Sequence, residues 1–305
     1  VTDNTHLKGT EGNSGFGVFA RYNYNGKILS LLDTEHVTWN KDQKHWGYEN
    51  TRYWPNEGSV DFYAFAPYST APILVSPNKN EANPTCIYFP SNVSPVDLVW
   101  ANAKDRTKTN EPVKFTFNHA LARLGFDITA NQDLEENGAV IKVKEVKLYG
   151  ADEISGVFVM AGYLNLENGA WTLADNGIRW FYTWTPDGKV DGNENVNEKD
   201  GTVLKLSTSQ LDHEHDIITN DADSYIFIIP QVKYFPFYLQ ITYKVKQGDF
   251  EEEVTVRKNL LDVRNPPGDP NPSFSFEMGK AYVFHLKLSL DPINFNVTTK
   301  VEDWK

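Results

Sequence analysis

One stretch of the sequence carries side-chain oxygens at a spacing that resembles a calcium-binding loop. Four alternating positions supply them: Asp191, Asn193, Asn195 and Asn197. A loop of the EF-hand type needs glycine at its sixth position and a bidentate glutamate at its twelfth, and this sequence has Val196 and Thr202 there. A solvated hairpin loop is therefore the simpler interpretation, and we predict no metal site.

Histidine side chains offer two further possibilities. His213 and His215 place two imidazoles on one face of the run DHEHD, but no third ligand follows at a spacing typical of metal sites. His119 lies among apolar residues, where Asp97 or Asp127 could orient it as a general base. No nucleophile elbow, paired carboxylates or phosphate-binding loop accompanies it. We therefore interpret His119 as a hydrogen-bonded structural residue and predict no enzymatic activity.

The composition of the 305-residue chain excludes several classes of protein. A net charge of −12, with scattered Lys and Arg residues, opposes binding to nucleic acid. The single cysteine, Cys86, rules out an intrachain disulfide and lacks a sequence context that would activate its thiol. The longest apolar run, 225–230, is far shorter than a membrane span, and the start at Val1 without a signal sequence indicates a processed chain.

Aromatic residues make up 13% of the chain, and few segments show a helical period, which together favour an all-β fold. Five rings gather in one turn-rich stretch: Trp39, Trp46, Tyr48, Tyr53 and Trp54. If their faces are exposed, these rings could stack on sugars. Packing in the interior and at the edges of a sandwich is the simpler interpretation, because such a fold needs large rings to fill it.

The stretch 111–128 (EPVKFTFNHALARLGFDI) organises the rest of the chain. Its apolar residues fall on odd positions up to Leu121 and on even positions from Leu124 onward. Because a strand alternates its side chains between two faces, both halves are buried only if a bulge or break lies near Ala122 and Arg123. Such a strand can leave one sheet and enter its partner, as corner strands do. We expect strands of β-sandwiches on both sides of it.

Alternating apolar residues mark strands in both halves of the chain. The first half has clear strands at 15–24 and 60–67, and the second half has the cleanest alternation at 282–290. We predict a domain boundary after the hairpin that ends near Leu173, which gives an N-terminal domain of residues 1–173 and a C-terminal domain of residues 174–305. The final segment, 293–301, alternates as well, so it either closes its own sheet or adds to another molecule.

Several sequence blocks, in order, resemble the fimbrillin-like surface proteins of Bacteroides and its relatives, which form type V pili. The blocks are GFGVFA (15–20), YWP (53–55), VDFYAFAP (60–67), DLVWA (97–101), VKFTFNHALARLGFDI (113–128), YIFIIPQ (225–231), GKAYVFHLKL (279–288) and INFNVTTKVEDW (293–304). The resemblance spans nearly the whole chain. Its most specific part is NHALARLGF in order with the other blocks.

This resemblance implies an all-β fold of two transthyretin-like Greek-key β-sandwich domains, export as an outer-membrane lipoprotein and assembly into fimbriae at the cell surface. In shaft subunits of the family, a protease removes the first strand of the N-terminal domain, and the groove that opens takes the C-terminal strand of another subunit. Carried onto this sequence, the donor strand comprises Ile293, Phe295, Val297, Val301 and Trp304. The acceptor groove comprises Phe16, Val18, Phe115, Phe117 and Phe126.

We therefore predict a non-enzymatic pilus subunit with structural and adhesive roles, which assembles by β-strand donation and needs no cofactor. Its expected partners are other pilus subunits, in a homo- or heteropolymer, together with a receptor or glycan on a host or bacterial surface. The alternative is a carbohydrate-binding outer-membrane lipoprotein that uses exposed aromatic rings, Trp39, Trp46 and Trp54.

Overall fold

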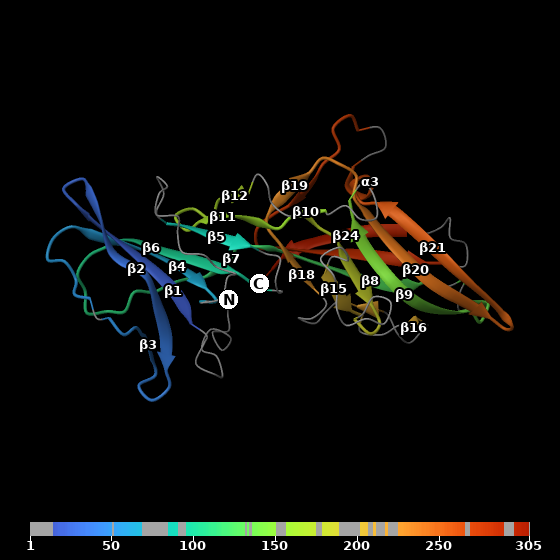
Figure 1. Cartoon of the computed structure of the whole chain (residues 1–305), viewed down its shortest axis with the longest axis horizontal. Helices are drawn as coiled ribbons and strands as arrows, with labels where there is room; N and C mark the ends of the chain where they lie inside the picture. Colours follow the sequence, from blue (N-terminus) through green and yellow to red (C-terminus); the bar gives the residue numbers. More distant parts are fainter. Residues whose placement is uncertain are drawn as a thin grey trace. The chain divides into compact units, whose positions relative to one another are not determined.

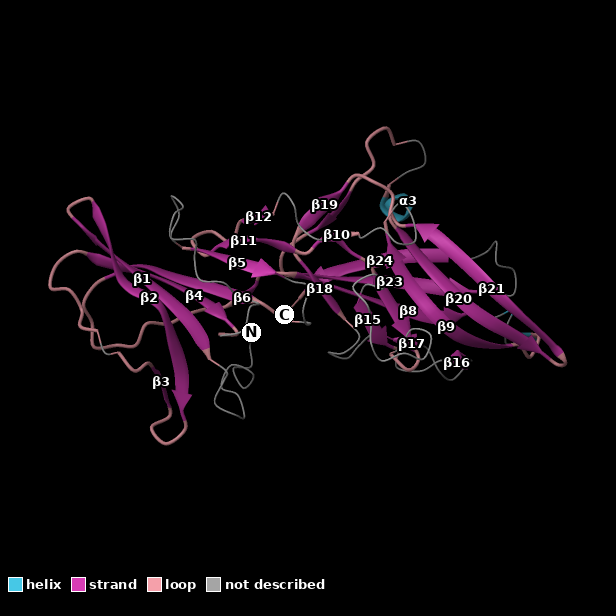
Figure 2. Cartoon of the chain, viewed as in Figure 1, coloured by secondary structure: helices cyan, strands magenta, loops and turns pink. Residues whose placement is uncertain are grey.

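A computed structural model describes residues 15–50, 52–68, 85–90, 96–131, 133, 136–150, 157–174, 179–188, 202–206, 210–211, 217–218, 225–265, 269–289 and 296–304. Strands dominate these residues, and α3 (Leu261–Arg264) is a single helical turn (Figure 2). The prediction of an all-β fold is confirmed. Within the described residues, no helix is long and apolar enough to cross a membrane.

Contacts between residues divide the chain into two compact units. Unit 1 comprises Val1–Leu121 and Ala161–Asp175, and unit 2 comprises Ala122–Met160 and Asn176–Trp304. This division differs from the single predicted boundary at residue 173. Residues 122–160 join unit 2 because their strands pair with strands from the last third of the chain.

Unit 1 is built on a sheet in the strand order β3-β2-β1-β4-β6-β7 and a smaller sheet in the order β12-β11-β5 (Figure 1). The strands are β1 (Phe16–Tyr24), β2 (Lys27–Asn40), β3 (His45–Gly47), β4 (Ser59–Ala66), β5 (Cys86–Pro90), β6 (Val99–Arg106), β7 (Asn118–His119), β11 (Ala161–Asn165) and β12 (Trp171–Leu173). Both faces of the larger sheet are apolar. Phe16, Val18 and Ala20 are buried on one face of β1, and Phe19 is fully buried on the other.

Strand β2 is one continuous strand, although its apolar residues change phase. Leu32 pairs with Ala20 and Val37 pairs with Phe16, so an even and an odd residue share one face. Irregularities in the β1–β2 register and a positive φ of 60° at Thr34 allow this. Sequence periodicity alone splits β2 into two short strands at this point.

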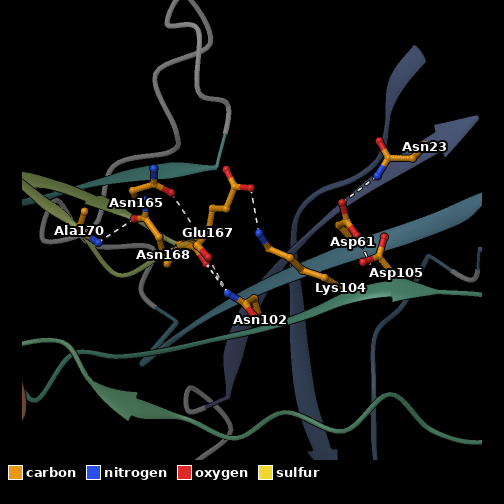
Figure 3. Close-up of polar contacts among 10 residues, drawn as sticks. Asn23, Asp61, Asn102, Lys104, Asp105, Asn165, Glu167, Asn168 and Ala170 are labelled. Atoms are coloured by element: carbon orange, nitrogen blue, oxygen red, sulfur yellow. Dashed lines mark hydrogen bonds and ion pairs between the residues drawn. The ribbon is translucent and has the colours of Figure 1, made fainter. Parts of the chain in front are cut away.

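Polar contacts fasten the β11–β12 turn to the large sheet (Figure 3). The side-chain amide of Asn102 donates to the carbonyl oxygen of Glu167 at 2.8 Å, and the ammonium of Lys104 lies 2.9 Å from the Glu167 carboxylate. On the same sheet, Asp61 accepts hydrogen bonds from the Asn23 side chain and the Asp105 backbone N–H. These contacts hold two segments of unit 1 together that are far apart in the sequence.

Tyr63 is buried in this part of unit 1. Burial raises the pKa of its phenol to about 12, and the nearby carboxylates of Asp61, Glu167 and Asp105 act in the same direction. A buried phenol surrounded by negative charge holds its proton well above neutral pH. Tyr63 is therefore a neutral packing residue.

Unit 2 has two main sheets around one large core (Figure 1). One sheet has the order β15-β14-β9-β20-β21, with β16 also on β9, and the other has the order β17-β8-β23-β24, with β18 also on β8. The strands are β8 (Ala122–Ala130), β9 (Val140–Tyr149), β10 (Phe158–Val159), β13 (Arg179–Trp180), β14 (Tyr182–Thr185), β15 (Thr202–Lys205), β16 (Gln210–Leu211), β17 (Ile217–Ile218), β18 (Ile226–Ile228), β19 (Gln231–Lys233), β20 (Tyr238–Gln247), β21 (Phe250–Asn259), β22 (Phe274–Phe276), β23 (Lys280–Leu288) and β24 (Asn296–Asp303).

The break that the phase change predicts near Ala122 is present. β7 pairs with β6 in unit 1, and β8 begins at Ala122 in unit 2, where it pairs in parallel with β23. Leu121 and Leu124 are both buried, each in its own unit. The change of side-chain phase thus marks the point where the chain passes from one unit to the other.

Candidate assembly groove

A groove with a volume of about 890 Å³ lies in unit 1, against one face of the large sheet. Strands β1 and β2 form its floor, and the extended segment 112–117 forms one wall. Its apolar and aromatic lining residues are Phe16, Val18, Leu31, Leu32, Val37, Trp39, Trp46, Tyr48, Tyr53, Trp54, Phe62, Pro112, Val113, Phe115 and Phe117. The remaining lining residues are Lys44, His45, Arg52, Glu111, Lys114 and Thr116.

The floor of the groove follows from the alternation in β1. Phe16 and Val18 point to the same face because they are two residues apart in a strand. Across from them, Val37 pairs with Phe16, so that β2 extends the apolar surface. These side chains belong to one buried cluster of unit 1, which continues into β4 and β6. The floor is therefore rigid sheet, and not loop.

Side chains in the wall segment, 112–117, alternate every second residue as they do in β1. Val113, Phe115 and Phe117 are half-buried, and the residues between them are exposed. The rings of Phe115 and Phe117 pack edge-on against Phe16, with centroids 5.9 and 5.5 Å from it. This alternation of half-buried and exposed residues is typical of an extended backbone, and within the described part of the chain the segment forms no strand ladder. Among the described residues, its backbone hydrogen-bonding groups thus border the groove without pairing to a strand.

Three indole rings also line the groove. Trp46 packs edge-on against Phe16 at 5.2 Å and against Trp39 at 5.4 Å, the latter being its cross-strand partner in β2. Trp54 packs edge-on against Phe62 of β4, with ring centroids 5.7 Å apart. The three indoles are half-buried. They are therefore neither fully exposed platforms nor core residues, because each contributes to the groove wall.

Four of the five residues predicted for the acceptor groove come together here. Phe16, Val18, Phe115 and Phe117 all line the groove. Phe126 does not, because it follows the phase change and lies in the core of unit 2, where its ring packs against Trp184 at 5.0 Å. Its placement in the groove is corrected by the structure. Leu32 and Val37 also line the groove and were not predicted, because their shared face depends on the irregular β1–β2 register.

The C-terminal strand closes its own sheet in this structure. β24 pairs with β23 from Lys287↔Asn296 to Lys280↔Asp303 and forms the edge of the sheet. Of the predicted donor residues, Val297 is buried at 4% exposure, and Val301 is 37% exposed. Trp304 stacks on Phe227. Ile293 and Phe295 lie outside the described residues.

The other candidate residues have structural surroundings. The Nδ1 atom of His119 lies 2.9 Å from the Asp97 carboxylate, as one of the two sequence alternatives proposes. Asp127 instead pairs with His285 at 2.6 Å in unit 2. Cys86 is half-buried in β5. Among the residues that the structure describes, no group of three or more His, Cys, Asp or Glu side chains could hold a metal ion.

The calcium-like loop, 191–202, and the run DHEHD, 212–216, fall almost entirely outside the described residues; only Thr202 is described, as the first residue of β15. Both remain sequence-based interpretations.

The architecture is that of an all-β protein with two units, each built from more than one sheet. The family profile described as Fimbrillin-like matches residues 1–304, and the chain belongs to this family. Pilus-subunit and adhesion roles at the cell surface come with that membership. No curated protein matches the sequence at a significant level.

Two solved structures show the same fold. A fimbrial protein from Bacteroides vulgatus is 19% identical, with a TM-score of 0.65, over 96% of this chain and 94% of that chain. A putative cell adhesion protein from Bacteroides uniformis is 16% identical, with a TM-score of 0.50, over 98% of this chain and 94% of that chain. At these identities the likeness concerns the fold alone.

Proposed function

We propose that the groove of unit 1 accepts a β-strand from another pilus subunit. The observation that carries this proposal is the wall segment 112–117, which is extended, alternates half-buried and exposed residues, and forms no ladder among the described residues. A strand added along it would satisfy its backbone N–H and C=O groups. The same strand would insert every second side chain into the apolar groove, and each insertion contributes about 1.5 to 3 kcal/mol of burial.

The donor in this proposal is the C-terminal strand, with Ile293, Phe295, Val297, Val301 and Trp304 as its inserted residues. Ile293, Phe295, Val297 and Val301 fall on odd positions and so share one face of a strand, which is the spacing that an apolar groove requires, whereas Trp304 follows them out of this phase. Charge favours the pairing weakly. The groove is lined by Lys44, Arg52 and Lys114 against one acidic residue, Glu111, and the donor segment 293–304 carries Glu302 and Asp303 against one basic residue, Lys300. Donation requires β24 to leave β23, since one strand cannot occupy both places.

The experiment combines one defect on each side of the contact. An acceptor-defective chain carries Phe115→Asp and Phe117→Asp. A donor-defective chain carries Val283→Cys and Lys300→Cys at paired positions, so that a disulfide clips β24 to β23. Wild-type protein should give a heat-sensitive ladder on unboiled gels. Each defective chain alone should stay monomeric. Their mixture under oxidising conditions should stop at a heterodimer, because the acceptor-defective chain can still donate its β24 to the groove of the clipped chain.

Reduction of the clip provides the matched control. In the reduced mixture, both chains can donate β24. Only the chain with the reduced clip can also accept a strand in its groove. Ladders should therefore return, with growth ending at acceptor-defective chains. A ladder from the oxidised clipped chain alone would show that assembly does not use β24, and a ladder from the Phe115→Asp/Phe117→Asp chain alone would exclude the groove.

Anchoring to the outer membrane through a lipid is a further part of the proposal. It rests on the family resemblance. Cells that express the full-length precursor should incorporate labelled palmitate into this protein and retain it in the outer-membrane fraction. A precursor that stays unlabelled and soluble would contradict a lipoprotein anchor.

Carbohydrate binding is the second candidate function, because Trp39, Trp46 and Trp54 all reach the groove. Half-buried indoles keep part of a ring face available for stacking on a sugar. A glycan array should then show binding that is lost in Trp46→Ala and Trp54→Ala chains. Binding that survives both changes would exclude the groove as the sugar site.

A further inference from the structure

Trp304, which directly follows β24, packs against side chains from two other strands of unit 2. Its ring stacks on Phe227 of β18, with centroids 5.2 Å apart and planes 10° apart. The guanidinium of Arg123 in β8 lies 5.4 Å from the Trp304 ring and 4.2 Å from the Tyr225 ring. We call these side chains the C-terminal clamp: Arg123, Tyr225, Phe227 and Trp304.

Main-chain and charge contacts support the clamp at the same end of β24. The backbone N–H of Trp304 donates to the carbonyl oxygen of Gly279 at 2.9 Å. The ammonium of Lys280 lies 2.5 Å from the carboxylate of Asp303. Arg123 and Phe227 are direct cross-strand partners, so the surface that receives Trp304 is itself held in a sheet. The clamp therefore joins the end of β24 to two paired strands of unit 2.

The rest of β24 has few side-chain attachments. It is an edge strand with a ladder to β23 on one side. Val297 is its buried side chain, and the residues from Lys300 to Asp303 are exposed. An edge strand separates from its sheet most easily from an end, where each broken hydrogen bond exposes the next. Contacts that fix its last residue thus have a large effect on how often the strand opens.

We propose that the C-terminal clamp retains β24 in the isolated subunit and that its opening limits the rate at which β24 becomes available to another subunit. The retention of β24 follows from the contacts within one molecule. The effect on assembly rests on the proposed function, strand donation. Phe227 and Arg123 lie outside the donated segment, so their substitution loosens the clamp and leaves the donor sequence unchanged.

The first experiment measures backbone hydrogen exchange in the full chain. Phe227→Ala removes a stacked aromatic contact, and we expect amides in 296–304 to exchange about tenfold faster, with little change in β20 and β21. Arg123→Lys keeps the charge but loses the planar guanidinium, and a smaller increase is expected. Phe250→Ala is the matched control, because Phe250 is an aromatic residue of unit 2 that is 59% exposed. Exchange in 296–304 that equals wild type in both clamp variants would overturn the proposal.

The second experiment follows ladder growth with the same variants and with the disulfide-clipped chain. Faster growth in Phe227→Ala supports clamp opening as the limiting step. Amide exchange in 296–304 can be faster in Phe227→Ala while its ladder growth is unchanged. If the clipped chain also fails to assemble, clamp opening is not the limiting step, but strand donation stands. Growth of the oxidised clipped chain at the wild-type rate contradicts donation itself, and the exchange data then still decide whether the clamp retains β24. If Phe227→Ala fails to fold, Phe227→Leu and Arg123→Lys provide the same comparison.

Discussion

Gly169 in the β11–β12 turn lies directly against the indole of Trp100 in β6. A Cβ atom on Gly169 would be 2.3 Å from Cζ2 of Trp100, and the φ angle of Gly169 is +76°. The absence of a side chain thus serves two purposes, because it permits the left-handed backbone and it lets the turn approach the sheet.

Replacement of Gly169 should therefore destabilise unit 1. We expect Gly169→Ala to lower the free energy of unfolding by about 2 to 4 kcal/mol, as the sum of backbone strain and a steric clash. Gly26→Ala is the matched control, because Gly26 has a φ of +73° and open space around its Cβ position. Urea unfolding should show a smaller loss for Gly26→Ala. Equal losses would mean that the contact with Trp100 contributes nothing.

Tyr63 predicts how stability changes at alkaline pH. Its pKa is raised to about 12 in the folded chain, whereas an unfolded tyrosine titrates near ~10. The unfolded chain loses this proton first. The contribution of Tyr63 to the free energy of unfolding is therefore complete below pH ~10. It is lost as the pH rises through the pKa of Tyr63 in the folded chain, by up to about 1.4 kcal/mol per pH unit. Tyr63→Phe should flatten this decline. Parallel curves for the two proteins, measured by urea unfolding, would contradict the prediction.

Phe126 and Phe117 should differ in their effects on stability, although the family resemblance assigns both to one groove. Phe126→Ala leaves a cavity in the core of unit 2, and we expect a loss of about 3 to 5 kcal/mol in the free energy of unfolding. Phe117 is half-buried, so Phe117→Ala should cost about 1 to 2 kcal/mol. A hydrophobic dye that binds the groove should respond to Phe117→Ala alone. A similar dye response in both chains would place Phe126 near the groove.

The cationic side chains of the groove should accelerate capture of the donor segment 291–305, which carries three acidic and two basic side chains. We expect Arg52→Glu and Lys114→Glu together to slow the association of a synthetic 291–305 peptide about tenfold at low salt. The difference should shrink in 1 M NaCl, where charges are screened beyond about 3 Å. Lys104→Glu is the control, because Lys104 pairs with Glu167 and does not line the groove. An equal effect of Lys104→Glu would indicate a general charge effect.

The family resemblance indicated four of the residues that line the groove, and alternation in the sequence predicted the crossing between units. Phe16, Val18, Phe115 and Phe117 alternate within regular segments, and the change of phase after Leu121 marks the crossing correctly. Phe126 was misplaced because a phase change shows that the chain changes sheets, but not which sheet it enters. Its pairing with Phe284 of β23 depends on residues far along the chain.

Two other features of the structure could not be predicted from the residue types in their own segments. Leu32 and Val37 reach one face only because the β1–β2 register is irregular, and a bulge is not visible in residue types at these positions. The clamp on Trp304 requires Arg123 and Phe227 to be neighbours, which the pairing of β8 with β18 determines. The interleaved division into units follows from the same long-range pairings, and so the boundary predicted at residue 173 does not account for residues 122–160.

The pairing of β8 with β23 also determines when unit 2 can fold during synthesis and export. Their paired residues Asp127 and His285 are 158 positions apart. A chain that emerges from the ribosome or an export channel, amino terminus first, therefore presents an apolar β8 long before its partner exists. The β8–β23 pair cannot form until β23 has emerged, so a chain that is truncated or stalled before β23 exposes an aggregation-prone strand.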